Sequence, residues 1–303
     1  MELKQTPSPS LPLPPTTEGD DPCTIEVSDM AMDCVTLLIG LCGLVGNGAV
    51  LWLLGFRIRR NPVTVYILNL AISDFTFLLF VLTSSFLYVL DNVNCSTAFF
   101  KYLQLLFLLS LFSYNTGLYL LTAISIERCV SILFPLWYRC CRPQWLSAVV
   151  CALLWALSIA VFAAVSSLCL EQKESCQVAL ISMYALDFFI FAPSMVVSNV
   201  LLFFKVLCVS QGPQPKRLYI VISLTVLFFL LFALPLSIWN FLQQFGYFLV
   251  PTQVVFLLAC INSSINPFIY FLVGSCQKRC SLVSLQVAFQ RVFEETGLTM
   301  ISS

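Results

Sequence analysis

The chain alternates between long apolar runs and short polar connections. Seven apolar runs can be followed, at about residues 33–56, 63–90, 99–133, 146–168, 177–207, 218–241 and 252–273. Each reaches or exceeds the roughly 20 residues that an α-helix needs to cross the hydrocarbon core of a bilayer. The pattern therefore predicts an all-α membrane protein, with residues 33–273 forming one seven-transmembrane helix bundle.

The two ends of the chain differ from this bundle. Residues 1–32 are rich in Pro, Ser, Thr and acidic residues, and they contain no apolar run that resembles a signal peptide. We expect a disordered extracellular N-terminus here, with the first span serving as an uncleaved membrane signal. Residues 274–303 are expected to form a short amphipathic helix in the membrane interface, followed by a cytoplasmic tail, because apolar side chains recur on one helical face beside basic ones.

Composition and charge agree with a membrane protein of fixed orientation. The chain is 59% hydrophobic, and its formal net charge is zero. With the N-terminus outside, the cytoplasmic segments would hold 12 of the 15 basic residues, namely Arg57, Arg59, Arg60, Arg128, Arg139, Arg142, Lys205, Lys216, Arg217, Lys278, Arg279 and Arg291. This bias predicts a multi-pass protein of the plasma membrane with its N-terminus outside and its C-terminus cytoplasmic. Membrane lipids are expected partners, and nucleic-acid binding has no support.

The sequence lacks a residue type and a pairing that many catalytic sites use. The chain contains no histidine, which removes most metal-ligand, proton-relay and histidine-based catalytic schemes. Paired intramembrane aspartates at a catalytic spacing are also absent. We therefore predict that the protein is not an enzyme, has no catalytic residues and needs no cofactor.

One acidic residue, Asp74, lies near the middle of the second span, where a carboxylate is costly and suggests a functional site. Asn262, Ser263 and Asn266 in the seventh span could place neutral oxygens around it. Carboxylate, amide and hydroxyl oxygens suit a hard cation such as sodium, which would be the one metal bound. The alternative is a protonated aspartic acid in a structural hydrogen-bond network. Gly117 stands where a serine or threonine of the third span would offer a hydroxyl, so the third span supplies no ligand at that position.

A second intramembrane acid, Asp187, lies about 10 residues into the fifth span, roughly 15 Å along the helix axis. It could meet a basic group of a ligand, or it could form hydrogen bonds within the bundle while protonated. Ser110 and Tyr114 share one face of the third span at a spacing of i, i+4. Ordinary helix packing is the alternative for each such residue. The candidate ligand-binding residues are Ser110, Tyr114, Asp187, Trp239, Asn240 and Gln243.

Ordered motifs fall on successive spans. Pro267 removes a backbone donor within the seventh span, so the helix should kink there. The full set is Gly46-Asn47, Leu70-Ala71-x-x-Asp74, Glu127-Arg128-Cys129, Trp155, Pro193, Pro235 and Asn266-Pro267-x-x-Tyr270. In this order and placement the motifs resemble those of the rhodopsin-like G-protein-coupled receptors, and the resemblance covers about residues 33–293.

A finer resemblance points to the Mas-related receptors. Matching stretches include Leu121-Thr122-Ala123-Ile124-Ser125-Ile126-Glu127-Arg128-Cys129 and Leu133-Phe134-Pro135-Leu136-Trp137-Tyr138. Two absences agree with that family: Leu103 replaces the usual helix-three cysteine, and Ala233 replaces the usual tryptophan before Pro235. The resemblance implies a disulfide between Cys169 and Cys176, which also bracket a short loop on the oxidising side of the membrane.

The same resemblance implies partners. These are a heterotrimeric G protein of the Gq or Gi type and an extracellular peptide or small-molecule ligand. Family members that bind strongly cationic ligands use acids where this chain has Val165 and Leu180, so a cationic ligand is not implied. The residues expected to serve G-protein coupling and activation are Glu127, Arg128, Lys216, Arg217, Asn266, Pro267 and Tyr270.

The start of the sixth span carries no acid that could hold Arg128, so only Glu127 is expected to do so. From this we predict measurable signalling without ligand. Cys276 and Cys280, at i, i+4 beside the membrane, are candidates for palmitoylation, although unmodified thiols remain an alternative. Asn94 begins a glycosylation sequon whose middle residue is Cys95. A membrane transporter and a non-signalling decoy receptor remain the competing functions.

Overall fold

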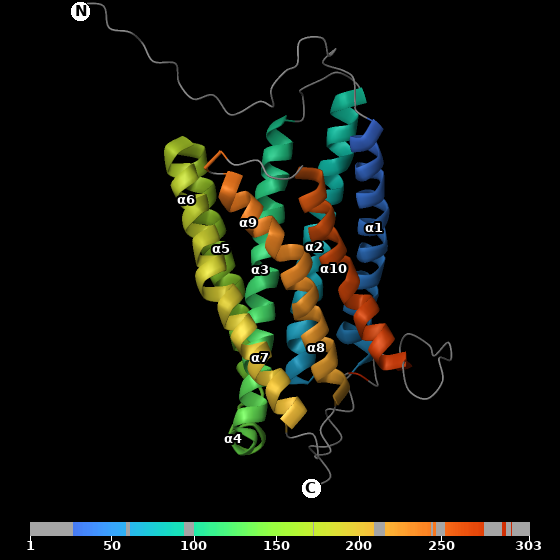
Figure 1. Ribbon diagram of the computed structural model, residues 1–303, viewed down its shortest axis with the longest axis vertical. Helices are drawn as coiled ribbons and strands as arrows, with labels where there is room; N and C mark the ends of the chain where they lie inside the picture. The colour runs from blue at the N-terminus through green and yellow to red at the C-terminus, as the bar shows by residue number, and fades with distance from the viewer. Residues whose placement is uncertain are drawn as a thin grey trace, which may run out of the picture.

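A computed structural model describes residues 27–58, 61–93, 100–171, 173–208, 216–243, 245–246, 252–275, 287–288 and 292. All regular secondary structure within these residues is helical (Figure 1). Six helical segments are long and apolar enough to cross a membrane. An uninterrupted helical run from Lys216 to Gln243 takes the remaining place, between the fifth and last spans, where the sequence predicts the sixth.

The first five spans run from α1 to α7. Span one is α1 (Val27–Trp52) with the π-helical turn η1 (Leu53–Arg57), span two is α2 (Pro62–Val93), and span three is α3 (Phe100–Leu133). The short helix α4 (Pro135–Cys140) follows, and span four is α5 (Leu146–Glu171). Span five consists of α6 (Lys173–Leu186), the π-helical turn η2 (Asp187–Phe191) and α7 (Ala192–Cys208).

The last two spans complete the bundle. Span six consists of α8 (Lys216–Phe228), the π-helical turn η3 (Phe229–Ala233) and α9 (Leu234–Gln243), and span seven is α10 (Thr252–Ser275). Helix α1 begins at Val27, earlier than the first apolar run expected at about residue 33. Hydropathy marks where a helix enters the membrane, whereas the helix itself continues into polar residues.

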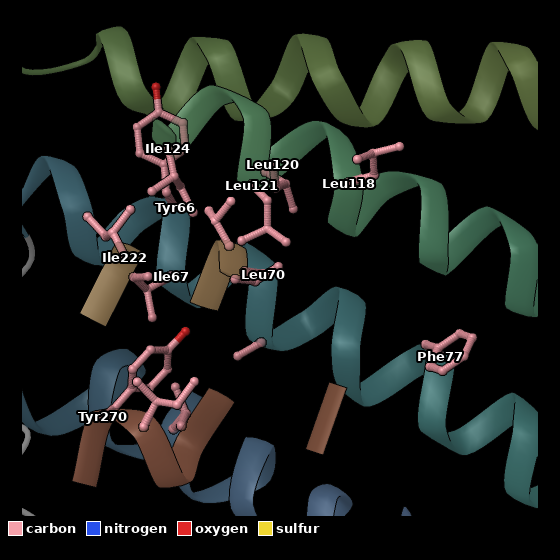
Figure 2. Packing of buried hydrophobic residues seen from close by; sticks show 14 of the residues in the cluster. Tyr66, Ile67, Leu70, Phe77, Leu118, Leu120, Leu121, Ile124, Ile222 and Tyr270 are labelled. Carbon is pink, nitrogen blue, oxygen red and sulfur yellow. The ribbon is translucent and has the colours of Figure 1, made fainter. Parts of the chain in front are cut away.

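The helices lie side by side in one bundle (Figure 1). Helix α3 lies at its centre and contacts α2, α5, α7 and α8, while α1 packs on α2 and α10. Figure 2 shows Leu70, Leu121 and Tyr270 pointing into the interior shared by α2, α3 and α10. Apolar side chains also cover the outside: Leu153 of α5 is 65% exposed. Such an apolar exterior suits lipid rather than water.

Small residues let α1 approach its neighbours closely. A Cβ added at Gly43 would overlap Oγ of Ser264 and lie 2.7 Å from Leu78, so a side chain has no room there. A Cβ at Gly46 would lie 3.1 Å from Pro267. Glycine therefore sets the distance between α1 and α10, as small residues often do between membrane helices.

The bundle has two ends that carry different features. The N-terminal end holds the start of α1, and the opposite end, called the α4 end here, holds α4 and the start of α5 (Figure 1). The amphipathic helix expected after the last span is not confirmed, because most of residues 276–303 lie outside the described residues. Within that stretch, Val287, Ala288 and Val292 are helical.

Candidate functional site

A buried polar cluster occupies the α4 end, where the last turns of α3 meet α4 and the start of α5. Oε1 of Glu127 accepts hydrogen bonds from the Tyr138 hydroxyl at 2.8 Å and from Nη2 of Arg142 at 2.8 Å. Nη2 of Arg128 lies 3.3 Å from the same oxygen and 2.6 Å from the Tyr138 hydroxyl. The side chains of Arg128 and Glu127 are only 4% and 10% exposed.

Tyr138 joins the two arginines of this cluster. The guanidinium carbons of Arg128 and Arg142 lie 5.5 and 5.1 Å from the centre of its ring, within the range of cation–π attraction. Burial raises the pKa of the Tyr138 hydroxyl to about 12, so the group stays protonated and donates to Glu127. Pro135 at the first turn of α4 favours the helix that carries Tyr138.

The expectation that only Glu127 holds Arg128 is therefore wrong. Tyr138 also holds it, and Arg142 competes for Glu127 while donating to Ser147 as well. The sequence did contain a signal, since Tyr138 and Arg142 follow α3 within one short connection. Lys216 and Arg217, the other basic residues expected to serve coupling, begin α8 at this same end; their side chains are not described.

A second polar cluster surrounds Pro267 in the middle of the bundle. Proline lacks the N–H that would bond to the carbonyl four residues earlier, which belongs to Ser263. That carbonyl instead accepts a hydrogen bond from Nδ2 of Asn47 at 2.9 Å. Nδ2 of Asn266 donates to Oδ2 of Asp74 at 2.7 Å. The motifs of spans one, two and seven thus form one buried network.

This network also offers oxygen ligands for a cation. Asp74 is buried and contacts Ser263 besides Asn266. The buried Oδ1 atoms of Asn262 and Asn266 accept no hydrogen bond from the described residues. A carboxylate with two unused amide oxygens fits sodium chemically. Helix α3 brings no hydroxyl at Gly117, but Oγ of Ser73 lies beside that position, where an added Cβ would be 3.3 Å away. Tyr270 is buried in the same region, near Asp74 and Thr225.

Asp187 belongs to span five and is 1% exposed. It begins the π-helical turn η2, a type of distortion often found at functional sites. One turn earlier, Met183 accepts a hydrogen bond from Nδ2 of Asn115 at 3.0 Å. Tyr119, one turn after Asn115, points its hydroxyl toward Asp187, but the two groups do not close a hydrogen bond. Asp187 therefore faces α3 inside the bundle.

A cavity of about 380 Å³ opens at the N-terminal end between α1, α2, α3 and α10. Among the candidate ligand residues whose side chains the structure describes, Ser110 alone lines it. Its other lining residues are Asp33, Thr36, Val81, Ser84, Ser85, Tyr88, Leu103, Phe107, Gln253 and Phe256. Sequence reasoning missed this cavity, because its polar residues are scattered over four helices and form no local motif.

The remaining candidate ligand residues lie elsewhere. Tyr114 and Trp239 are buried in the hydrophobic core, and Gln243 is half-buried at the end of α9. Asn240 belongs to α9, and its side chain is not described. The structure thus does not gather the five described candidates into one site.

A small cluster of apolar side chains packs at the N-terminal end between α5, α6 and α9. Val165 is 5% exposed and packs in one cluster with Leu111, Met183 and Tyr184. Leu180 lies against the same cluster. These two positions, where cation-binding relatives were expected to carry acids, are thus occupied by packed apolar groups.

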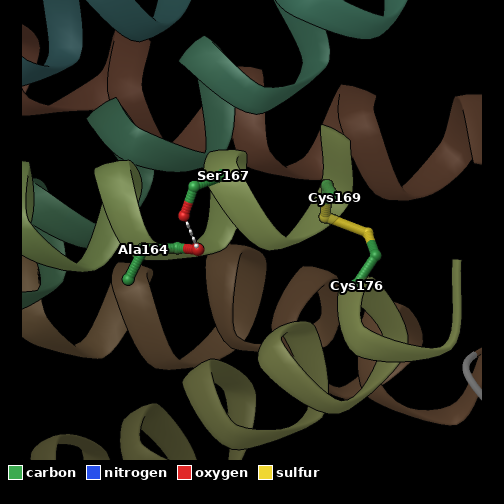
Figure 3. Close-up of a disulfide and its surroundings, with 4 residues drawn as sticks. All are labelled: Ala164, Ser167, Cys169 and Cys176. Carbon is green, nitrogen blue, oxygen red and sulfur yellow. Dashed lines mark hydrogen bonds between the residues drawn. A yellow bond between two sulfur atoms is a disulfide. The ribbon is translucent and has the colours of Figure 1, made fainter. Parts of the chain in front are cut away.

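The predicted disulfide is confirmed. Sγ of Cys169 and Sγ of Cys176 are bonded at 1.99 Å, and the bond joins the end of α5 to the start of α6 (Figure 3). A crosslink that closes so short a loop is expected to contribute roughly 2.5 kcal/mol in the chain-entropy estimate. It fixes spans four and five together at the N-terminal end. The candidates for glycosylation, Asn94, and for palmitoylation, Cys276 and Cys280, lie outside the described residues.

The chain matches known proteins over most of its length. The family described as 7 transmembrane receptor (rhodopsin family) matches residues 46–270. Proto-oncogene Mas of Homo sapiens is 42% identical over 272 residues, which cover 86% of this chain and 82% of Mas. Mas-related G-protein coupled receptor member H of Rattus norvegicus is 42% identical over 273 residues, covering 86% and 83%. Member D of Macaca fascicularis is 38% identical over 282 residues, covering 89% and 87%.

Fold and matches together define a rhodopsin-like seven-transmembrane receptor, which is a multi-pass protein of the plasma membrane and not an enzyme. Within that class, the chain belongs to the Mas-related G-protein-coupled receptors. The family resemblance predicted from its motifs is confirmed.

Proposed function

We propose that this receptor binds an extracellular peptide or small molecule at its N-terminal end and activates heterotrimeric G proteins of the Gq or Gi type at its α4 end. The observation that carries the proposal is the burial of Arg128 together with the groups that bind it. It is buried at the end of α3, yet it is held by groups of a short surface helix and by its own neighbour Glu127. A rearrangement of α4 would release this cation toward a partner.

The N-terminal cavity supports the ligand half of the proposal. Its volume of about 380 Å³ falls within the range of small-molecule sites. Hydroxyl groups of Ser84, Ser85 and Tyr88 and the carboxyl group of Asp33 line it beside aromatic rings. This chemistry suits a ligand, or the end of a peptide, that combines an apolar body with hydrogen-bond donors. The N-terminus is then outside and the C-terminus cytoplasmic, as the distribution of basic residues favours.

The proposal extends to the polar network around Asp74. We propose that it holds a sodium ion in the resting receptor, with Asp74 supplying the charge and Asn262, Ser263 and Asn266 supplying neutral oxygens. The unused amide oxygens of the two asparagines support this role. A purely structural hydrogen-bond network, with Asp74 protonated, is the competing role of the same residues.

The test of coupling measures dissociation of Gq and Gi heterotrimers in cells that express the chain, with and without a panel of peptides and small molecules. Arg128→Ala should abolish the signal at equal surface expression. Arg57→Ala is the matched control, because Arg57 is an exposed arginine at the end of span one, at the same end of the bundle. A wild-type chain that reaches the surface but never dissociates either heterotrimer would favour a decoy receptor. Solute uptake without such dissociation would favour a transporter.

A further inference from the structure

Two adjacent free thiols, Cys140 and Cys141, are exposed where α4 ends. Trp137 and Trp145 flank them in sequence and are 42% and 63% exposed. Exposed tryptophan is typical of the level at which membrane meets water. Leu136, which is 79% exposed, adds an apolar group in the same segment. Exposed aromatic and apolar side chains beside the thiols are thus typical of a segment at the depth of the lipid headgroups.

The same segment is anchored to the receptor through its other face. Tyr138 bonds to Glu127 and Arg128, and Arg142 bonds to Glu127 and Ser147. These inward contacts fix the orientation of α4, because residues on either side of Cys140 and Cys141 are bound to α3 and α5. The exposed thiols and apolar side chains are left on the side that faces lipid and water.

We propose that Cys140 or Cys141 is S-acylated with a long-chain fatty acid. Sγ forms a thioester bond to the acyl carbonyl carbon of an acyl-CoA, whose own thioester bond breaks. CoA leaves as its thiol and carries the proton that the cysteine loses, so no oxidant or reductant is needed. Thiols beside the membrane on an amphipathic segment are typical substrates of this modification.

An acyl chain on this segment would enter the bilayer beside the apolar side chains that already face it. It would hold α4 at the membrane surface and keep Tyr138 against Arg128. The inference rests on the proposed orientation, because acyl-CoA is a cytosolic donor. Among the described free thiols, Cys129, Cys151 and Cys260 are buried. Cys34 and Cys42 are exposed but belong to α1, with Cys34 toward the N-terminal end.

The experiment labels cells with an alkyne fatty acid, purifies the full chain and measures the label that hydroxylamine releases from thioesters. Cys276 and Cys280 are first replaced by serine, so that acylation at the other candidate positions cannot supply the label. In this background, the label should persist with the further change Cys34→Ser. It should fall to that of an unlabelled sample when Cys140→Ser and Cys141→Ser are combined.

A label that is unchanged by the combined Cys140→Ser and Cys141→Ser change would overturn the inference, as would a background with no label. An N-terminal epitope, stained on intact and permeabilised cells, separates this failure from that of the proposed orientation. If the epitope is stained on intact cells and the label is absent, only the acylation is wrong. If the epitope appears only after permeabilisation, the orientation itself is wrong.

Discussion

The hydroxyl of Tyr138 lies 2.6 Å from Nη2 of Arg128, and thereby connects a short surface helix to the buried end of α3. The same hydroxyl donates to Glu127 at 2.8 Å. Arg128 is therefore held by a residue outside the transmembrane bundle, and the position of α4 determines whether this contact exists. A receptor built in this way can change its resting activity through the connection between spans three and four.

Removal of this hydroxyl should raise basal signalling. Tyr138→Phe keeps the ring under both guanidinium groups but loses the bonds to Arg128 and Glu127. A hydrogen bond to a charged group contributes about 1.5–3 kcal/mol, so the loss should shift the balance toward released Arg128 by roughly ten- to a hundredfold. Heterotrimer dissociation without ligand, at matched surface expression, measures the shift.

The control for this prediction is Tyr102→Phe, which removes an exposed hydroxyl from the other end of α3. It should leave basal dissociation unchanged. Basal activity that stays equal or falls in Tyr138→Phe would show that the contact does not restrain the resting receptor. Measurable signalling without ligand stays a prediction. We expect its level to depend on Tyr138 as well as on Glu127.

Filling the N-terminal cavity should abolish the ligand response and spare basal activity. Ser85 lines the cavity on α2, and the larger side chain in Ser85→Phe would occupy its space. The matched control is Ser167→Phe, because Ser167 is an exposed serine of α5 that does not line this cavity. The measurement is a concentration–response curve with an agonist found in the panel. An unchanged curve in Ser85→Phe would place the ligand elsewhere.

A methyl group added to span one should be tolerated at one glycine, Gly55 of η1, and not at another, Gly43 of α1. The new Cβ of Gly43→Ala would meet Ser264 and Leu78 below 3.0 Å, so α1 must move away from α2 and α10. Overpacking of this kind typically costs about 1–3 kcal/mol. Gly55→Ala meets nothing within 4 Å and serves as the control. Thermal unfolding of the purified receptor should show a lower Tm for Gly43→Ala alone; equal Tm values would contradict the close approach.

The positions of the spans could be predicted from the sequence, because the thickness of the bilayer sets the length of the apolar runs. The sequence also indicated the buried contact between Asp74 and Asn266, because each motif residue has a characteristic place in its span. The bond from Asn47 to the carbonyl of Ser263 was not predicted. The direction of individual side chains was harder to predict. A π-helical turn such as η3 holds an extra residue, which rotates the helix beyond it by roughly 100° relative to an ideal α-helix.

Trp239 and Gln243 follow η3 and were expected, together with Asn240, to contact the ligand. In the structure Trp239 turns into the core, where it is 6% exposed. Contacts across helix ends were missed for a different reason. The hydrogen bond between Tyr138 and Arg128 depends on the fold of one short connection. The periodicity of the sequence does not predict how close these two residues come.

Sodium should stabilise the receptor only while Asp74 carries its charge. Binding to the folded state adds about 1.4 kcal/mol when the ion is at ten times its Kd. We therefore expect a higher Tm in sodium chloride than in choline chloride of equal concentration, because choline is too large to replace a desolvated ion. In Asp74→Asn the side chain keeps its shape, loses its charge and should lose the difference in Tm.

Asp187→Asn is the matched control for the sodium prediction, because Asp187 is also a buried carboxylic acid within a span. It lies against Tyr119 of α3 and outside the network of Asp74 and Asn266, so its loss should leave the sodium effect intact. Equal Tm values of the wild-type receptor in the two salts would leave Asp74 with the structural role alone. A sodium effect that disappears in Asp187→Asn but persists in Asp74→Asn would move the ion to the cluster between spans three and five.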